Sequence, residues 1–534
     1  MRMTNKIMQN NSLYNINNNK ILQDKLSTQM STQKKLTRPS DDPVIAIRAL
    51  RLRTSVSELT QYNDKNAPDA ESWLDVTGKA LGTVTEVLTD MTKQANKGSN
   101  KDLGSEDLRI IVEQIKSLRD EFYSTGNVDY AGRYVFTGYR TDTTMSFTKE
   151  VEENMPSYSI TEQNTIGDFD SINYTDIGRL DGMNKNNYDT IPPTTDPALT
   201  EQEVTNGDIH RMRLAYDDLQ SAGGVTIQLM DGTPAPGHFV TTTTVSTSAD
   251  PNPYETIQTA NNAPDQIETS PGVFEDNPAK TAVVYVPETG EILFSNKAYE
   301  SLEGSVTTDT EIRFTYTKNQ WESGDLRPEH YFACTGQTGT DPAIDYNQEY
   351  LTGTKNKQAI EYDVGYNQTI QVNTTADEVF NHNLDRDVDD LENALTELVE
   401  IEATKEDLDH VLENMDPESA DYETTKDKYD AADKAYSYIR DKIHKMFEGT
   451  ITSVQGYLDD TNVAITDNGT RSQRLDLISN RLMDQKTTFK TLQSENEDAD
   501  IAEVAVQLTS TELTYNAALM ATGKIMQTSL MNYI

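Results

Sequence analysis

Apolar residues in the last part of the chain, 499–534, recur at steps of three, four or seven, which is the spacing of one face of an α-helix. A second series falls roughly on the opposite side of this helix, because successive residues advance by about 100°. The first series is Ile501, Val504, Ala505, Leu508, Tyr515, Ala518, Leu519, Thr522, Ile525 and Met526, and the second is Val506, Leu513, Ala517 and Met520. A helix that is apolar on two faces needs two surfaces to bury against, so we expect it to pack between neighbours.

The start of the chain carries a narrower apolar stripe, of the kind that forms a coiled-coil seam. Its residues, several of them seven apart, are Ile7, Tyr14, Ile21, Leu22, Leu26 and Met30. Seven of the first twenty residues are Asn, which is a poor helix former. We therefore expect this segment to fold only when its stripe packs against the C-terminal helix.

Acidic residues are nearly absent from both ends, although the whole chain holds 88 Asp and Glu against 46 Lys and Arg. The first acidic residue is Asp24, and no Asp, Glu, Lys, Arg or His lies between Glu512 and Lys524. Two interpretations stay open here: an ordinary antiparallel helix pair that closes a globular domain, or a surface for self-assembly. Around a shared axis every charge is repeated in each copy, so the loss of acid favours self-assembly.

The rest of the chain alternates between helical and β-rich stretches. Pro68 predicts a kink or break in the first long helical stretch, and residues 414–417 predict a helical hairpin. In the middle, Asn206-Gly207 and Asp231-Gly232 are typical of turns between strands. We expect an α+β multidomain fold with three parts: coiled-coil-like helical layers from 1–42 and 494–534, a helical-bundle domain with a β-hairpin from 43–145 and 364–493, and an inserted β-rich region of one or two domains at 146–363.

Composition excludes several classes of function. A chain of 534 residues predicts two to four domains rather than one core. The net charge of −42 argues against nucleic acid and anionic membrane surfaces as partners. No run approaches the roughly 18 apolar residues that span a bilayer, and the N-terminus lacks the apolar stretch of a cleaved secretory signal. The single Cys334 excludes an intramolecular disulfide.

Two short motifs lie between the predicted helices. Residues 31–43 read Ser-Thr-Gln-Lys-Lys-Leu-Thr-Arg-Pro-Ser-Asp-Asp-Pro, where Ser40 or Asp41 can cap a helix and Pro43 suits its first turn. Residues 132–141 begin Gly-Arg-Tyr-Val-Phe-Thr-Gly-Tyr, and aromatic and β-branched residues between two glycines predict a strand or hairpin arm.

Together with the terminal helices, these motifs resemble the flagellin superfamily over roughly 1–147 and 365–534. Gln33 stands where the family has Gly, and we expect this change to weaken nothing essential. The loop similar to the family's is Arg38, Pro39, Ser40, Asp41, Asp42 and Pro43. The hairpin residues Gly132, Arg133, Tyr134, Phe136 and Gly138 are similar to junction-type members of the family rather than to filament flagellin. The C-terminal helix fits in pattern only.

The resemblance implies an axial structural protein of the extracellular bacterial flagellum, exported through the flagellar type III apparatus, with an export chaperone, and without a cleaved signal. It implies a ring at the hook–filament junction, where copies of the chain contact one another, the other hook-associated junction protein and flagellin. The predicted assembly interface is Ile7, Tyr14, Ile21, Leu22, Leu26, Ile501, Val504, Leu508, Leu513, Tyr515, Leu519, Met520, Ile525 and Met526.

Catalysis has little support, and we expect no cofactor and no metal. The six His residues are scattered and form no His-Glu-x-x-His pair, and Cys334 has no His nearby in sequence. Residues 385–396 begin like a calcium loop, but Asp390 and Thr396 occupy the positions that need Gly and Glu, so we expect a helix start with acidic residues instead. Alternatives remain open: a filament flagellin with a large central insertion, or an enzymatic or carbohydrate-binding insertion on a flagellar scaffold.

Overall fold

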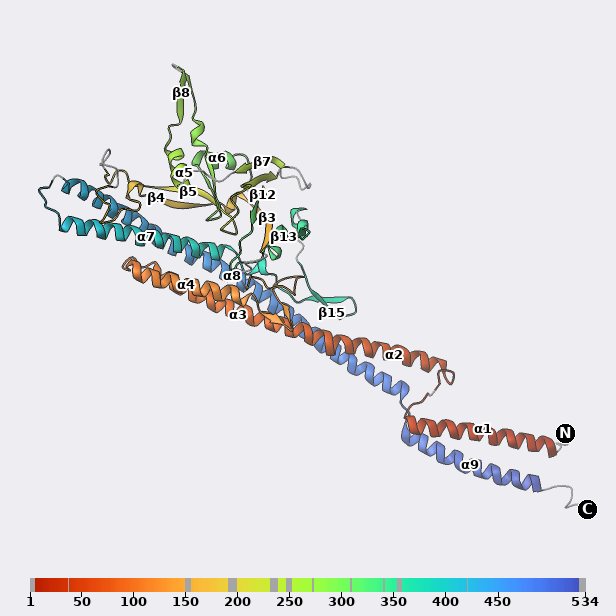
Figure 1. Cartoon of the computed structure of the whole chain (residues 1–534). Coiled ribbons are helices and arrows are strands. Elements are labelled where there is room, and N and C mark those ends of the chain that lie inside the picture. The colour runs from red at the N-terminus through yellow and green to blue at the C-terminus, as the bar shows by residue number, and fades with distance from the viewer. Residues whose placement is uncertain are drawn as a thin grey trace, which may run out of the picture. The chain divides into compact units, whose positions relative to one another are not determined.

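Long helices and an inserted β-rich region make up the chain, as the sequence predicts (Figure 1). The computed structural model describes residues 5–36, 38–148, 155–190, 199–230, 239–245, 252–270, 273–307, 310–339, 341–352, 358–419 and 421–527. The α-helices are α1 Asn5–Thr32, α2 Pro43–Gln61, α3 Ala67–Gly98, α4 Ser105–Thr125, α5 Pro253–Asn262, α6 Asn296–Glu303, α7 Asn383–Glu413, α8 Tyr422–Glu497 and α9 Ile501–Gln527. None of these described helices is both long and apolar enough to cross a membrane.

The strands lie mostly between α4 and α7. They are β1 Asp129–Tyr130, β2 Arg133–Tyr134, β3 Pro156–Asn164, β4 Asp170–Asp176, β5 Thr205–Arg213, β6 Val225–Met230, β7 Phe239–Val245, β8 Gln266–Ser270, β9 Val273–Asp276, β10 Val283–Val286, β11 Glu291–Phe294, β12 Ile312–Lys318, β13 Ala333–Thr338, β14 Ile344–Tyr346, β15 Glu361–Gly365 and β16 Gln368–Gln371.

The chain forms two compact units. We call Met1–Ser72, Tyr362–Ile370 and Ser472–Ile534 the terminal unit, and Trp73–Glu361 and Gln371–Arg471 the central unit. Each is described by itself below. The three-part domain division that composition suggests stays a prediction.

In the terminal unit α1 and α9 lie side by side and antiparallel (Figure 1). Asp42, rather than the expected Ser40 or Asp41, caps α2, because its Oδ1 accepts from the amides of Val44 and Ile45 at 3.0 and 3.1 Å. Asp500 caps α9 in the same way, because its Oδ1 accepts from the amides of Ala502 and Glu503 at 2.9 and 3.2 Å.

Before Pro68 the helix does not break but widens into a π turn, Tyr62–Asn66, in which the Ala67 amide bonds to the Tyr62 carbonyl. Proline has no N–H and its ring crowds the carbonyl four residues earlier, so a wider turn absorbs what would otherwise be a kink. Of the predicted kink or break, the break is wrong, because the helix continues through the π turn.

Two antiparallel sheets organise the central unit. One has the strand order β10-β11-β5-β4, and the other β14-β13-β3-β12-β6-β7. Their main core includes Ile160, Leu214, Phe314, Tyr316 and Trp321. The turn predicted at Asn206-Gly207 is wrong, because both residues lie inside β5 and pair with β4. The turn predicted at Asp231-Gly232 lies outside the described residues.

The motif hairpin is shorter than expected. Strands β1 and β2 hold two residue pairs, joined by Ala131 and Gly132 with φ of 53° and 78°, the signs that a type I′ turn needs. The segment after Tyr134 leaves the ladder because Phe136 turns inward, fully buried, with its ring centroid 5.0 Å from that of Phe380. The strand predicted over 132–141 is thus mostly loop.

Candidate assembly surface

Helices α1 and α9 pack through heptad positions that alternate in steps of three and four. Between residues 6 and 26 the buried or half-buried positions of α1 are Gln9, Ser12, Ile16, Asn19, Gln23 and Leu26. The facing positions on α9 are Val504, Leu508, Thr511, Tyr515, Ala518 and Thr522, with Ala505 beside them. Uncharged polar groups fill much of this seam, so the pair buries little apolar area for its length.

The prediction that the N-terminal apolar stripe packs against the C-terminal helix is wrong for most of its residues. Ile7, Tyr14 and Ile21 do not face α9 but lie on the outer side of α1, where Tyr14 is 67% and Ile21 64% exposed. A seven-residue spacing marks a helix face without saying which neighbour it meets, and α1 carries a second heptad series that takes the contact. Leu26, only 3% exposed, is the predicted α1 residue that does lie in the seam.

The outer faces of both helices are apolar. The exposed large apolar residues are Ile7, Met8, Leu13, Tyr14, Ile21, Leu22 and Met30 on α1, and Ile501, Val506, Leu513, Leu519 and Met520 on α9. Leu513 is 74% and Met520 73% exposed, on the side of α9 opposite the seam. The side chains of Ile525 and Met526 lie outside the described part. Contiguous apolar surface of this kind marks an interaction site.

A compact joint links the helix pair to the rest of the terminal unit. The Lys35 amide donates to the Glu497 carbonyl at 2.7 Å, and the Ala499 amide donates to the Gln33 carbonyl at 2.9 Å. The Arg53 guanidinium binds the Glu497 carboxylate through two hydrogen bonds of 2.7 and 2.6 Å, and this lowers the pKa of Glu497. Lys34 pairs with Asp498 at 2.5 Å and lowers its pKa.

Gln33 adopts φ of 59° in this joint, a left-handed conformation that costs a non-glycine residue roughly 1–2 kcal/mol. Glycine adopts this φ without a Cβ penalty, so Gln33 has a local cost that a Gly here would not have. The reason is local: α1 ends at Thr32, and the chain must turn at the next residue to reach Lys34.

The motif loop is a turn on the surface of the terminal unit. The Asp41 amide donates to the Arg38 carbonyl at 3.0 Å, and Asp41 Oδ2 accepts from the Arg38 amide at 3.3 Å. Arg38, Pro39, Ser40, Asp41 and Pro43 are exposed and Asp42 is half-buried. The loop positions α2 through its cap and leaves its own side chains accessible.

The motif hairpin serves packing inside the central unit. The Arg133 guanidinium lies 4.9 Å from the Trp73 ring centroid, and Phe136 completes an aromatic cluster with Phe122 and Phe380. Gly138 has φ of 61°, and a Cβ there would meet Gln358 Oε1 at 2.3 Å. Gly132 is needed for the tight turn, and Tyr134 ends the short ladder.

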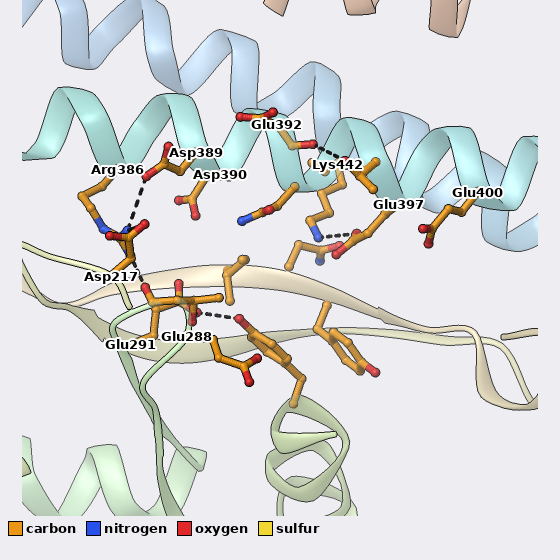
Figure 2. A pocket seen from close by; sticks show the side chains of 18 residues that line it. Asp217, Glu288, Glu291, Arg386, Asp389, Asp390, Glu392, Glu397, Glu400 and Lys442 are labelled. Carbon is orange, nitrogen blue, oxygen red and sulfur yellow. Dashed lines mark hydrogen bonds and ion pairs between the residues drawn. The ribbon is translucent and has the colours of Figure 1, made fainter. Parts of the chain in front are cut away.

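A cavity of about 520 Å³ in the central unit, beside α7, is the most acidic hollow we describe (Figure 2). Several of its carboxylates pair with cations: Lys442 binds Glu397 at 2.8 Å, and Arg386 contacts Asp389 at 3.4 Å. Burial raises the pKa of Asp389 to about 7. Across the described residues no group of three or more His, Cys, Asp or Glu is arranged to hold a metal ion.

The surroundings of the lone cysteine disfavour a nucleophilic role. Cys334 is buried in β13, and burial raises the pKa of its thiol, which suppresses the reactive thiolate. Asp385, Asp387 and Asp389 begin α7, as expected, and neutralise arginines: Asp387 binds Arg213 at 2.8 Å. No local pattern predicts the pairing of Asp387 with Arg213, because the two residues lie far apart in the chain.

Sequence reasoning also missed the polar seam and the joint. Gln9, Ile16 and Gln23 stand seven apart, as do Ser12, Asn19 and Leu26, so the seam of α1 leaves a heptad signal that an apolar-only search ignores. No comparable signal links Arg53 to Glu497, which lie far apart in sequence.

Residues 3–141 match the family described as the bacterial flagellin N-terminal helical region. The chain is 30% identical over 144 residues to flagellar hook-associated protein 3 of Escherichia coli K12, and 29% identical over 143 residues to that of Salmonella typhimurium. Each match covers 27% of this chain and 45% of the relative, so the chain spans less than half the length of these relatives.

Among solved structures, a flagellar hook-associated protein from Vibrio parahaemolyticus is 12% identical, with a TM-score of 0.34, over 86% of this chain and 100% of its own. The flagellar junction protein FlgL from Legionella pneumophila is 10% identical, with a TM-score of 0.25, over 81% and 99%. Because both TM-scores are below 0.5, the similarity of this chain to known proteins rests on its N-terminal region.

Proposed function

Because residues 3–141 carry a flagellin-type helical region, we propose that this chain is a structural subunit of the bacterial flagellum that forms the junction ring between hook and filament. The single observation that supports self-assembly is the apolar outer face of the α1–α9 pair. Its partners are copies of itself, the other hook-associated junction protein and flagellin. The subunit reaches the outside of the cell through the flagellar type III apparatus, with an export chaperone, and its role is structural rather than enzymatic.

The charge pattern suits this role. In a ring, each outer face of a helix pair lies against protein, and a carboxylate there is repeated in every subunit. Burying one unpaired charge costs several kcal/mol. The outer face of α9 between Leu513 and Gly523 holds no ionisable residue, so neighbours can approach it closely.

The test places carboxylates on the outer face without touching the seam. We expect Val506→Asp combined with Leu513→Asp to leave the secreted subunit folded and monomeric but to abolish filament growth. The matched control is Gln507→Asp with Thr514→Asp, two exposed positions one residue further along with the same spacing. Filaments per cell and secreted flagellin in the medium are the measurements, and filaments in the first variant, or none in the control, would overturn the assembly surface.

Antibody labelling of intact flagella tests the position in the assembly. A junction subunit gives one spot at the end of the hook and a minor band in sheared filaments. Labelling along the whole filament, with this chain as the dominant band, would instead identify a filament flagellin with a large central insertion.

A further inference from the structure

Lys318 is the most deeply buried lysine in the described chain. It ends β12, with 2% of its side chain exposed, and its Nζ lies 5.4 Å from the Trp321 ring centroid and 5.9 Å from that of Tyr216. The Nζ donates to the main-chain carbonyl of Asp217 at 2.7 Å. A buried amine needs polar partners, and the few that surround this one therefore matter.

Two carboxyl groups flank the amine at unequal burial. Asp325 Oδ2 lies 3.7 Å from Nζ, and its side chain is 19% exposed. Asp217 Oδ1 lies 3.3 Å from Nζ on the more open side, with 44% of its side chain exposed. The Glu322 amide fixes Asp325 Oδ2 through a hydrogen bond of 2.9 Å, so the buried carboxyl is held in place beside the amine.

The two carboxyls are suited to different roles. Burial raises the pKa of Asp325 to about 6, so an appreciable fraction of this group is a neutral acid, the form that an amine can attack. Asp217 is more open to water and is placed to accept a proton from the amine and to return it to a leaving group.

We propose that Lys318 and Asp325 join in an intramolecular amide bond, with Asp217 as the proton-transfer group. Asp217 takes one proton from the ammonium, and the freed nitrogen lone pair forms a bond to Cγ of protonated Asp325. The C–O bond to the carboxyl hydroxyl then breaks, and that hydroxyl leaves as water with the proton from Asp217. The nitrogen loses its second proton to solvent, which balances the proton that Asp325 had taken up.

Two effects favour the product. The reacting groups are held together by the fold, which gives an intramolecular reaction a high effective concentration. The amide also replaces the buried contact between Lys318 Nζ and Asp325 Oδ2 by a neutral group, and at 3.7 Å that contact is longer than a good charge-assisted hydrogen bond. The bond would close the loop between β12 and the next segment covalently.

The experiment is mass spectrometry of the purified full-length chain. We expect an intact mass one water lighter than the sequence. After denaturation, trypsin should fail to cleave after Lys318, and residues 314–355 should appear as one fragment lighter by one water. A cyclised aspartate elsewhere also loses water but leaves Lys318 cleavable. A full intact mass with cleavage after Lys318 in the wild-type chain would overturn the proposal without any variant.

Variants then identify the roles. Lys318→Arg should restore the full mass, and Asp325→Asn should lose one ammonia in place of one water. Asp217→Asn should slow the appearance of the bond about 100-fold, the usual contribution of one proton-transfer group. Unchanged kinetics in Asp217→Asn would remove that residue from the step, and an unchanged mass loss in Lys318→Arg would refute the assignment of the amine.

Discussion

The two units of this chain differ in net charge and in how far their apolar residues are exposed. The terminal unit holds 16 basic and 16 acidic residues, whereas the central unit holds 30 basic and 72 acidic residues and so carries the whole net charge of −42. The terminal unit exposes apolar helix faces, while the central unit closes its aromatic residues into a core. The neutral unit is suited to contact protein on its outer faces and the acidic one to face water, which is a division expected of an assembling subunit.

The largest expected effect on stability distinguishes the buried core of the central unit from the seam between α1 and α9. Phe380→Ala should lower the stability of the central unit by about 3–5 kcal/mol, because it empties the cluster with Phe122 and Phe136. Leu26→Ala should change only the protection of α1 and α9, because the polar seam holds those helices weakly. Thermal unfolding followed by circular dichroism, with hydrogen exchange by segment, distinguishes the two. A global loss in Leu26→Ala would break the comparison.

Acid should act on the central unit through its buried histidines. Burial lowers the pKa of His382 to about 3 and that of His330 to about 4, so folding keeps both neutral. This stability is complete above about pH 6.5, the ordinary histidine value, and is lost progressively as the pH falls toward those folded values. Relative to His382→Asn, the wild type should lose about 2 kcal/mol between pH 6.5 and pH 5.

The measurement is the difference between the wild type and the variant, because Asp389 acts in the opposite sense in both. Its raised pKa of about 7 favours the folded state as the pH falls. Parallel pH profiles of wild type and His382→Asn would show that His382 does not titrate as its burial requires.

Salt should change the stability of the two units by different amounts, because they differ in net charge. Screening relieves self-repulsion, so raising NaCl from low concentration should stabilise the central unit by on the order of 1 kcal/mol and leave the neutral terminal unit nearly unchanged. Segment-resolved hydrogen exchange at two salt concentrations measures both in one sample. Equal stabilisation of both units would point to a general effect of salt on apolar burial instead.

The smallest effect concerns the joint. Gln33→Gly should stabilise the α1–α9 pair by about 1 kcal/mol, because glycine adopts the φ of 59° without a Cβ penalty. Gln33→Ala keeps the Cβ and is the matched control, with no expected gain. Protection of α1 amides from exchange is the readout, and equal behaviour of the two variants would show that Gln33 is not strained.

Periodicity and turn chemistry predicted the long helices at both ends of the chain and the β-rich region between them. They failed where a residue has a choice of neighbours. Tyr14 and Leu26 both belong to heptad series on α1. Which of the two series is buried depends on the contact with α9, and residue spacing does not predict that contact. Asn206-Gly207 has turn composition, yet pairing with β4 holds it extended, as tertiary contacts often override local preference. Ion pairs such as Arg53 with Glu497 join distant residues, so no local pattern reports them.

A small rotation at the joint produces a large displacement at the far end of α1. Helix α1 has 28 residues, which makes it about 42 Å long at 1.5 Å per residue. A rotation of about 10° at Gln33–Lys35 would sweep the far end of this lever through about 7 Å, more than one helical turn. The ion pairs of Glu497 with Arg53 and of Asp498 with Lys34 resist this rotation. They therefore help to fix the position of the apolar outer face at the far end of α1.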